Sequence, residues 1–324
     1  MKYRHVGASG LKVSALSLGS WLTYGRNVDD GTAEKIIDTA YACGINSFDT
    51  ANGYYRGAAE TVLGHALKKY DRSSYVLASK IFFPMGEGPN DRGLSRKHLT
   101  EQLDAILTRL QTDYLDILYC HRPDEETPLY ETLRTLDDFV RRGKVLYIGV
   151  SEWSAAQLAQ ALALEDRYLL DRLVVHQPLY NLLNRRIEKE ILPFCRAEGI
   201  GQMVYSPLGM GMLTGKYHRD QPAPEGSRVT IGDIGPWMRR DYFTDRNFAK
   251  VERLRKIAED YGVSLANLSL AWVLDEPGVS SAIIGASRPE QVRSNVQAVE
   301  LVLTEEMKAR ILEAVADDED EQAP

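Results

Sequence analysis

Four polar residues stand at or near the ends of short apolar segments in this sequence. Asp49, Lys80 and His121 each close such a segment, and Tyr54 follows Asp49 by five residues. A phenol with a pKa of about 10 is a poor acid at neutral pH unless a nearby ammonium stabilises its phenolate. Lys80 would supply that charge, Asp49 would keep the lysine charged and oriented, and His121 would hydrogen-bond a substrate oxygen. The pattern therefore predicts proton donation to an oxygen atom.

Each of these residues also has a simpler interpretation. Asp49 could cap a helix, Lys80 could be a surface charge, and Tyr54 could pack in the core. A histidine with satisfied hydrogen bonds is common after an apolar strand, and Tyr55 is a second candidate for the acid. We favour catalysis, with Tyr54 chosen by its spacing from Asp49, because four such residues would meet on one rim of a parallel barrel.

The segments around these residues alternate between strand-like and helix-like patterns from about residue 15 onwards. This alternation is typical of parallel βα units, and we predict an α/β fold, a (β/α)8 TIM barrel with an N-terminal hairpin and extra helices. The hairpin spans residues 3–13 and would close the barrel floor. The predicted barrel strands are 15–18, 47–49, 76–80, 115–121, 145–151, 173–177, 201–206 and 281–285.

Apolar stripes and capping signals mark the predicted helices. One stripe at helical spacing comprises Leu99, Leu103, Ile106, Leu107 and Leu110. Ser154 and Ser287 are each followed three residues later by Gln or Glu, which predicts a capping box at both positions. Residues 208–247 show little periodicity and are predicted to form a long loop, either a lid or a surface insertion.

Composition limits the classes of protein that this chain can represent. Its 324 residues, 44% hydrophobic, suffice for one barrel domain over residues 1–316, followed by an acidic tail at 317–324. The net charge of -7 and the lack of a large basic tract argue against nucleic acid as a partner. Three widely spaced cysteines predict no disulfide framework. With no apolar leader or membrane span, we expect a cytoplasmic protein without membrane insertion.

Other nucleotide and metal motifs fail on inspection. Residues 209–216 resemble a phosphate loop, but Met210 occupies the first glycine position and Tyr217 replaces the serine or threonine. The same stretch has Thr214 in place of the third glycine of a dinucleotide-binding turn. The six histidines show no metal-ligand spacing, so no metal site is predicted.

Several motifs resemble those of the aldo-keto reductase superfamily, in order and over nearly the whole chain. They are Asp49-Thr50-Ala51-Asn52-Gly53-Tyr54 with Gly57, Glu60, Leu63 and Gly64, then 115–118 with 121–124, 147–151, 177–181, 205–208 and 284–287. Residues 3–14, Tyr55-Arg56 and 93–98 resemble the branch that contains potassium-channel β subunits and their bacterial relatives. Two residues depart from the channel subunits, His121 where they carry Asn and Glu152 where they carry Arg.

This resemblance implies NADP(H)-dependent reduction of aldehydes or ketones, with Tyr54 as general acid and Asp49, Lys80 and His121 completing the catalytic set. Ser151 and Gln177 would hold the carboxamide, and Tyr205 would stack on the nicotinamide. We favour NADP over NAD because Arg288, at a helix start, needs an anionic partner. The resemblance implies these cofactor-binding residues: Ser20, Trp21, Asp49, Ser151, Gln177, Tyr205, Ser206, Leu208, Gly209, Lys216, Arg228, Gly285, Ser287, Arg288, Gln291 and Asn295.

Aromatic residues near the predicted rim are candidates for a substrate pocket that binds a small carbonyl compound. The alternative to an enzyme is a nucleotide-binding regulatory or docking subunit with slow turnover, as in the channel relatives. The resemblance also implies a homo-oligomer. The candidate pocket residues are Trp21, Tyr55, Phe82, Phe83 and Trp153.

Overall fold

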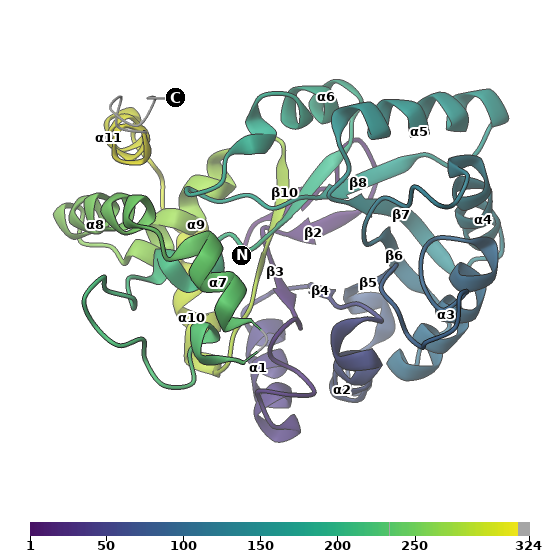
Figure 1. The fold of residues 1–324 in the computed structure, drawn as a ribbon, viewed down its shortest axis with the longest axis horizontal. Coiled ribbons are helices and arrows are strands. Elements are labelled where there is room, and N and C mark those ends of the chain that lie inside the picture. The colour runs from purple at the N-terminus through teal and green to yellow at the C-terminus, as the bar shows by residue number, and fades with distance from the viewer. Residues whose placement is uncertain (233, 317–324) are drawn as a thin grey trace.

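The computed structural model describes residues 1–232 and 234–316, and the predicted acidic tail lies outside this part. In the described residues, eight parallel strands close into a barrel in the order β10-β3-β4-β5-β6-β7-β8-β9 (Figure 1). This confirms the predicted TIM barrel. The strands are β3 (Leu16–Gly19), β4 (Ser47–Asp49), β5 (Val76–Ile81), β6 (Leu115–Cys120), β7 (Val145–Ser151), β8 (Leu173–Gln177), β9 (Gly201–Tyr205) and β10 (Val279–Ile284).

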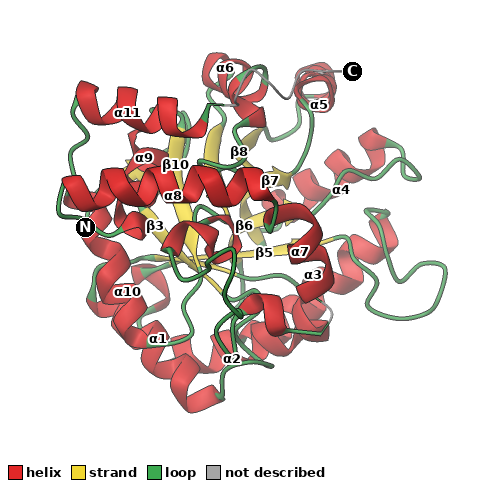
Figure 2. Cartoon of the chain, turned by 60° about the vertical axis from the view of Figure 1, so that its left-hand side comes forward, coloured by secondary structure: helices red, strands yellow, loops and turns green. Residues whose placement is uncertain are grey.

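Helices surround this barrel, as Figure 2 shows by the red helices around the yellow strands. The predicted stripe on α3 is buried along its whole length, so apolar burial of about 1.5–3 kcal/mol per large side chain holds the helix to the sheet. The helices are α1 (Asp30–Ala42), α2 (Ala58–Leu67), α3 (Arg96–Leu110), α4 (Leu129–Arg141), α5 (Ala155–Tyr168), α6 (Ile191–Ala197), α7 (Gly235–Tyr242), α8 (Asp245–Asp260), α9 (Leu265–Asp275), α10 (Pro289–Asn295) and α11 (Glu305–Val315).

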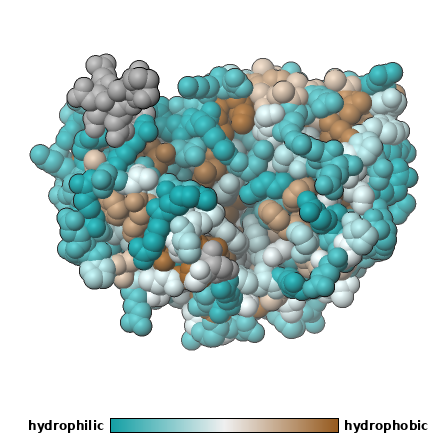
Figure 3. Space-filling view, viewed as in Figure 1, coloured by the Kyte–Doolittle hydropathy of each residue, from teal (hydrophilic) through white to brown (hydrophobic). Residues whose placement is uncertain are grey.

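Short 3-10 turns connect several of these elements. Within the described ranges, no helix combines the length and the apolar character that crossing a membrane requires. Figure 3 shows hydrophilic side chains over most of the face seen in Figure 1, with apolar side chains in smaller patches. The 3-10 turns are η1 (Tyr54–Gly57), η2 (Arg72–Ser74), η3 (Arg186–Glu188), η4 (Gly209–Thr214), η5 (Arg228–Thr230) and η6 (Val296–Glu300).

The N-terminal residues form the predicted hairpin, in which β1 (Tyr3–His5) pairs antiparallel with β2 (Lys12–Ser14). Val6 and Val13 pack in one cluster with residues of the barrel interior. Gly7 has a φ of +56°, and a Cβ atom there would lie 2.1 Å from the carbonyl oxygen of Gly199. Only glycine allows this close approach, so the hairpin closes the barrel at the end where the strands begin.

The two predicted capping boxes have different outcomes. The box at Ser154 is present, with both of its hydrogen bonds to Gln157. The prediction of a box at Ser287 is wrong, because α10 starts at Pro289 and its N-cap residue, Arg288, makes no side-chain capping bond. The backbone N–H of Ser287 instead donates to Oε1 of Gln291 at 2.8 Å. In a capping box this N–H would donate to the side chain of Glu290, but Gln291 accepts it here.

The segment 208–247 was predicted as a long loop and is more ordered than that. It contains η4, η5 and α7, and α8 begins within it at Asp245. Buried apolar residues hold these short elements to the barrel: Met210, Met212, Leu213, Val229 and Met238. Their spacing is irregular because each helix is only one or two turns long, so no helical period appears in the sequence.

Candidate active site

The four predicted catalytic residues meet at the rim where the barrel strands end. Asp49 is the last residue of β4, Lys80 is the penultimate residue of β5, and His121 directly follows β6. Lys80 forms a buried ion pair with Asp49, and its Nζ lies 3.3 Å from the hydroxyl oxygen of Tyr54. The rings of Tyr54 and His121 are 5.6 Å apart between centroids. Parallel strands deliver their last residues to one end, which is why residues so far apart in sequence converge.

Burial and neighbouring charges set the proton affinities at this site. Burial raises the pKa of Tyr54 above its usual value, and the ammonium of Lys80 opposes this rise. The net direction is opposite to the lowering that the sequence suggested, because desolvation of the phenolate outweighs one nearby charge. Burial alone would lower the pKa of Lys80, but Asp49 and Tyr54 outweigh it and raise that pKa.

His121 is a neutral imidazole in this environment. Burial lowers its pKa well below the usual range, and the charges of Lys80 and Arg122 act in the same direction. Its Nδ1 atom is buried and has no hydrogen-bond partner in the described residues. An unpartnered polar atom in a buried position is costly unless a ligand completes it. His121 also lines the cavity described below, so its ring is within reach of a molecule bound there.

The backbone of η1 separates Tyr54 from Tyr55. Tyr55, Arg56 and Gly57 all have positive φ values, of 50°, 53° and 89°. Left-handed backbone costs a residue other than glycine roughly 1–2 kcal/mol, and such strain collects at functional sites. The turn places the Tyr54 ring on the cavity wall, whereas Tyr55 is absent from that wall and its buried hydroxyl has no hydrogen-bond partner in the described residues. The structure therefore favours Tyr54.

A buried carboxylate behind this turn connects the elements that carry Tyr54 and Lys80. Glu60 on α2 accepts hydrogen bonds from Ser79 Oγ at 2.5 Å and from Arg109 Nε at 2.6 Å. Ser79 directly precedes Lys80 on β5. The Arg109 side chain also covers Gly57, where a Cβ atom would lie 2.5 Å from Arg109 Cδ. Glu60 therefore holds the strand of Lys80 and the turn of Tyr54 against α3.

We predict that Glu60→Gln lowers the free energy of unfolding by about 1–3 kcal/mol, because the amide keeps the shape but leaves the Arg109 charge unpaired. Urea unfolding followed by circular dichroism measures the change. Glu101→Gln is the matched control, since Glu101 pairs with Lys97 on the exposed face of α3. An exposed pair contributes less than about 1 kcal/mol. Equal losses in the two variants would contradict the role of Glu60.

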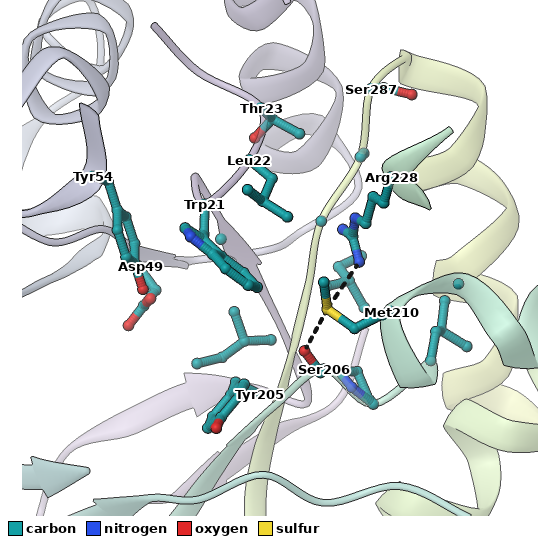
Figure 4. Close-up of a pocket in the computed structure, with 18 of the residues that line it drawn as sticks. Trp21, Leu22, Thr23, Asp49, Tyr54, Tyr205, Ser206, Met210, Arg228 and Ser287 are labelled. Carbon is teal, nitrogen blue, oxygen red and sulfur yellow. Dashed lines mark hydrogen bonds between the residues drawn. The ribbon is translucent and has the colours of Figure 1, made fainter. Parts of the chain in front are cut away.

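A cavity of about 420 Å³ opens beside these residues. It extends from Asp49 and Tyr54 past Trp21 to Arg228 and Ser287, as Figure 4 shows. The cavity extends across the rim from β4 to β10, and the segment that follows β9 forms part of its wall. Cavities of this size hold small molecules and cofactors.

The far end of the cavity is cationic. Burial, Arg228 and Arg288 lower the pKa of Lys216 to about 8. Within the described ranges, none of these three residues has a carboxylate within salt-bridge distance; the hydrogen bond of Arg228 is to Met210 Sδ at 3.9 Å. A Cβ atom on Gly285 would lie 2.9 Å from Arg228 Nη2, so glycine gives the guanidinium room. Clustered cations without carboxylate partners fit the phosphates of a dinucleotide.

Most of the cofactor-binding residues predicted from the sequence line this cavity. Ser20, Gly209 and Arg288 do not line it; the Ser20 hydroxyl is buried and donates to Thr50 Oγ1 at 2.8 Å. Those that do line it are Trp21, Asp49, Ser151, Gln177, Tyr205, Ser206, Leu208, Lys216, Arg228, Gly285, Ser287, Gln291 and Asn295.

The predicted aromatic pocket is only partly present. Trp21 and Phe83 line the cavity, whereas Tyr55, Phe82 and Trp153 do not. Trp153 is only 2% exposed and belongs to the core. The rings of the adjacent Phe82 and Phe83 meet edge to face at 85°, and only Phe83 lines the cavity. The sequence could not tell which of two neighbours faces the cavity.

Several cavity residues were not singled out from the sequence. Met210 and Gly211 are part of η4, and Ser227 precedes Arg228 in a segment without periodicity. Arg122 also lines the cavity, and its place directly after His121 is the one signal that would have found it. Glu152 lies beside the site, where its carboxylate accepts from the backbone N–H of Leu179 at 2.7 Å and pairs with Arg186.

Fold and cavity together define a (β/α)8 barrel with a nucleotide-sized cavity at the end where its strands finish. The Aldo/keto reductase family matches residues 15–316, and the chain belongs to this family. Members of the family interconvert carbonyl groups and alcohols with nicotinamide cofactors. Among the described residues, no group of three or more His, Cys, Asp or Glu side chains could hold a metal ion.

Two relatives cover almost the whole chain. One, from Arabidopsis thaliana, bears the name "Probable voltage-gated potassium channel subunit beta" and is 43% identical over 305 residues, 93% of this chain and 92% of its own length. Another of the same name, from rice, Oryza sativa subsp. japonica, is 40% identical over 316 residues, 96% of this chain and 95% of its own length. The resemblance to channel β subunits is thus confirmed.

Proposed function

We propose that this chain reduces aldehydes or ketones to alcohols, with NADPH as hydride donor and Tyr54 as general acid. The observation that carries the proposal is the 3.3 Å contact between Lys80 Nζ and the Tyr54 hydroxyl on the cavity wall. An ammonium at this distance stabilises the phenolate that forms when tyrosine gives up its proton. The family supports the reaction class.

The catalytic residues have separate tasks in this proposal. Tyr54 donates its phenolic proton to the carbonyl oxygen as negative charge develops there. Asp49 keeps Lys80 ionised and oriented through their buried ion pair, and Gln177 Nε2 donates to the second carboxylate oxygen of Asp49 at 2.9 Å. The neutral ring of His121 donates a hydrogen bond to the same carbonyl oxygen and so fixes its place near the Tyr54 hydroxyl.

The cavity residues fit a nicotinamide dinucleotide. When bound, NADPH supplies the hydride. Ser151 and Gln177 would hold the carboxamide, Tyr205 would stack on the nicotinamide, and Lys216 and Arg228 would bind phosphates. Ser206 and Leu208 would line the pyrophosphate, with the adenosine end between Gly285, Ser287, Gln291 and Asn295. The cationic far end supports NADPH over NADH, because its extra phosphate adds two negative charges for these cations to bind.

Steady-state assays test the proposal. The purified chain is mixed with a panel of small aldehydes, and the absorbance of reduced nicotinamide is followed with NADPH and separately with NADH. We expect aldehyde-dependent consumption of NADPH at a higher kcat/KM than that of NADH. A rate no higher than that without aldehyde, across the panel, would contradict the reductase.

The pKa of Lys216, lowered to about 8, predicts a pH-dependent affinity for NADP+. Below this pKa the lysine is charged and attracts phosphate; above it the free protein has lost the charge. The Kd of NADP+ is therefore expected to rise above pH 8 by up to about tenfold per pH unit, because binding then takes up one proton. Fluorescence titration measures this, and Lys216→Met should flatten the rise. A pH dependence retained in that variant would exclude Lys216 as its source.

The names of the relatives favour a second function, that of a nucleotide-binding regulatory subunit. Such a protein would bind NADP+ but turn over slowly. Tight binding of NADP+ combined with rates that Tyr54→Phe leaves unchanged would support it. We also propose that residues 1–316 act as one domain and that the chain assembles into a homo-oligomer, which light scattering of the purified protein would measure.

A further inference from the structure

We propose that Arg122 binds a carboxylate of the substrate, so that the preferred substrates are short aldehydes or ketones with a carboxylate a few bonds from the carbonyl. This inference rests on the reductase function proposed above and narrows its substrate class. It assigns a role to a cavity residue that takes no part in the proton transfer.

Arg122 lies at the reacting end of the cavity. It is half-buried, lines the cavity and directly follows His121. Its Nη1 donates to the backbone carbonyl of His121 at 2.6 Å and approaches Ser151 Oγ at 3.5 Å. Its guanidinium carbon is 5.7 Å from the centroid of Phe83, whose ring is 4.8 Å from that of His121. A group held by this guanidinium is therefore close to the carbonyl that His121 would position.

The guanidinium has donors to spare. Both of its hydrogen bonds to the described residues use Nη1, and no carboxylate in residues 1–232 and 234–316 lies within salt-bridge distance. The acid nearest in sequence, Asp124, instead accepts from the backbone N–H of Leu94 at 2.7 Å and from Thr127 Oγ1 at 2.8 Å. Arginine is the side chain best suited to bind a carboxylate with two parallel hydrogen bonds.

Other arginines in this barrel show the contrast. Arg72, Arg109 and Arg186 are each paired with an acid, namely Asp116, Glu60 and Glu152. Glu152, which follows Ser151 at the same rim, is already occupied by Arg186 and by the backbone N–H of Leu179. A half-buried cation without such a partner is unfavourable unless a bound anion completes it.

The charge of Arg122 acts on the reacting groups. It contributes to the lowered pKa of His121, after burial and Lys80, and it opposes the burial that raises the pKa of Tyr205. Phe83, which contacts Arg122, and Trp21 line the same cavity, and their apolar rings suit a short hydrocarbon linker. A substrate in which two or three carbons join the carbonyl to the carboxylate would pack its linker against this apolar wall and place its carboxylate at the Arg122 guanidinium.

The test compares 4-oxobutanoate with its methyl ester, which has the same chain without the charge. We expect the wild type to prefer the anion in kcat/KM by about 10- to 100-fold, the range of a hydrogen-bonded charge. Arg122→Met should reduce this ratio at least tenfold, mainly through the KM of the anion, and Arg122→Lys should retain part of it. Arg167→Met, an exposed arginine on α5, is the control and should leave the ratio unchanged.

Failure of this inference differs from failure of the reductase. Tyr54-dependent reduction of both substrates at similar kcat/KM would overturn the role of Arg122 and leave the reductase standing. If neither substrate is reduced, calorimetry measures the binding of 4-hydroxybutanoate to the protein with NADP+. Binding to the wild type that is lost in Arg122→Met supports the inference. Equal binding to the two proteins, or no binding to either, overturns it. A large rise in the Kd of NADP+ in Arg122→Met would show that Arg122 binds the dinucleotide, and this would also overturn the inference.

Discussion

Tyr54→Phe is expected to lower kcat for aldehyde reduction by about 10²–10⁴-fold, because the variant lacks the proton donor for the carbonyl oxygen. The phenyl ring keeps the packing of the site, so the Kd of NADP+ should stay within about twofold, a difference of roughly 0.4 kcal/mol. Steady-state kinetics and fluorescence titration measure the two quantities.

Tyr55→Phe is the matched control, since it removes the same hydroxyl from the neighbouring ring. That hydroxyl has no hydrogen-bond partner in the described residues and does not face the cavity. We expect kcat to stay within about threefold of the wild type. If Tyr55→Phe loses as much activity as Tyr54→Phe, the assignment of the acid is wrong.

Lys80→Met is expected to lower both activity and stability. The loss of the ammonium leaves the Tyr54 phenolate without its stabilising charge and the Asp49 carboxylate buried without its partner. Breaking a buried ion pair from one side costs about 3–5 kcal/mol of unfolding free energy. We expect kcat to fall at least as far as in Tyr54→Phe. The urea concentration at the midpoint of unfolding should fall in keeping with the lost unfolding free energy.

The pH dependence of this stability loss follows from the pKa of Lys80, which is raised in the folded protein. A raised pKa contributes stability that is fully present below the unfolded value of about 10.4 and is lost as pH rises through the folded value. Titration of Lys80 should therefore add no pH dependence to the stability of the wild type across neutral pH. Lys69→Met, which removes an exposed lysine paired with Glu34 and Asp38, should cost less than about 1 kcal/mol.

The buried polar residues of the site could be predicted from the sequence because they lie at or next to strand ends. Asp49, Lys80 and His121 lie at or next to strand ends, and the strand pattern alone predicts that such ends meet on one rim. The eight predicted strands occur in the described residues, most with an end shifted by one or two positions. Such shifts do not move a side chain from one end of the barrel to the other.

The aromatic wall and the capping box at Ser287 show where this reasoning fails. Phe82 and Phe83 are equally apolar, and only the backbone decides which of them faces the cavity. The box required a helix start at Ser287, but Gln291 competes for the same backbone N–H. Local patterns do not rank such alternatives, because their free energies differ by less than the packing around them contributes.

The sequence by itself determined the parallel barrel and the residues on its rim, because both follow from periodicity and order along the chain, and its motifs carried the resemblance to the family. The tertiary structure decided what depends on distance: that Tyr54 rather than Tyr55 faces the cavity, that burial raises the Tyr54 pKa despite Lys80, and that Arg122 has no carboxylate partner among the described residues. Electrostatic energies depend on the distance between charges and on their exposure to solvent, and the order of residues along the chain gives neither quantity.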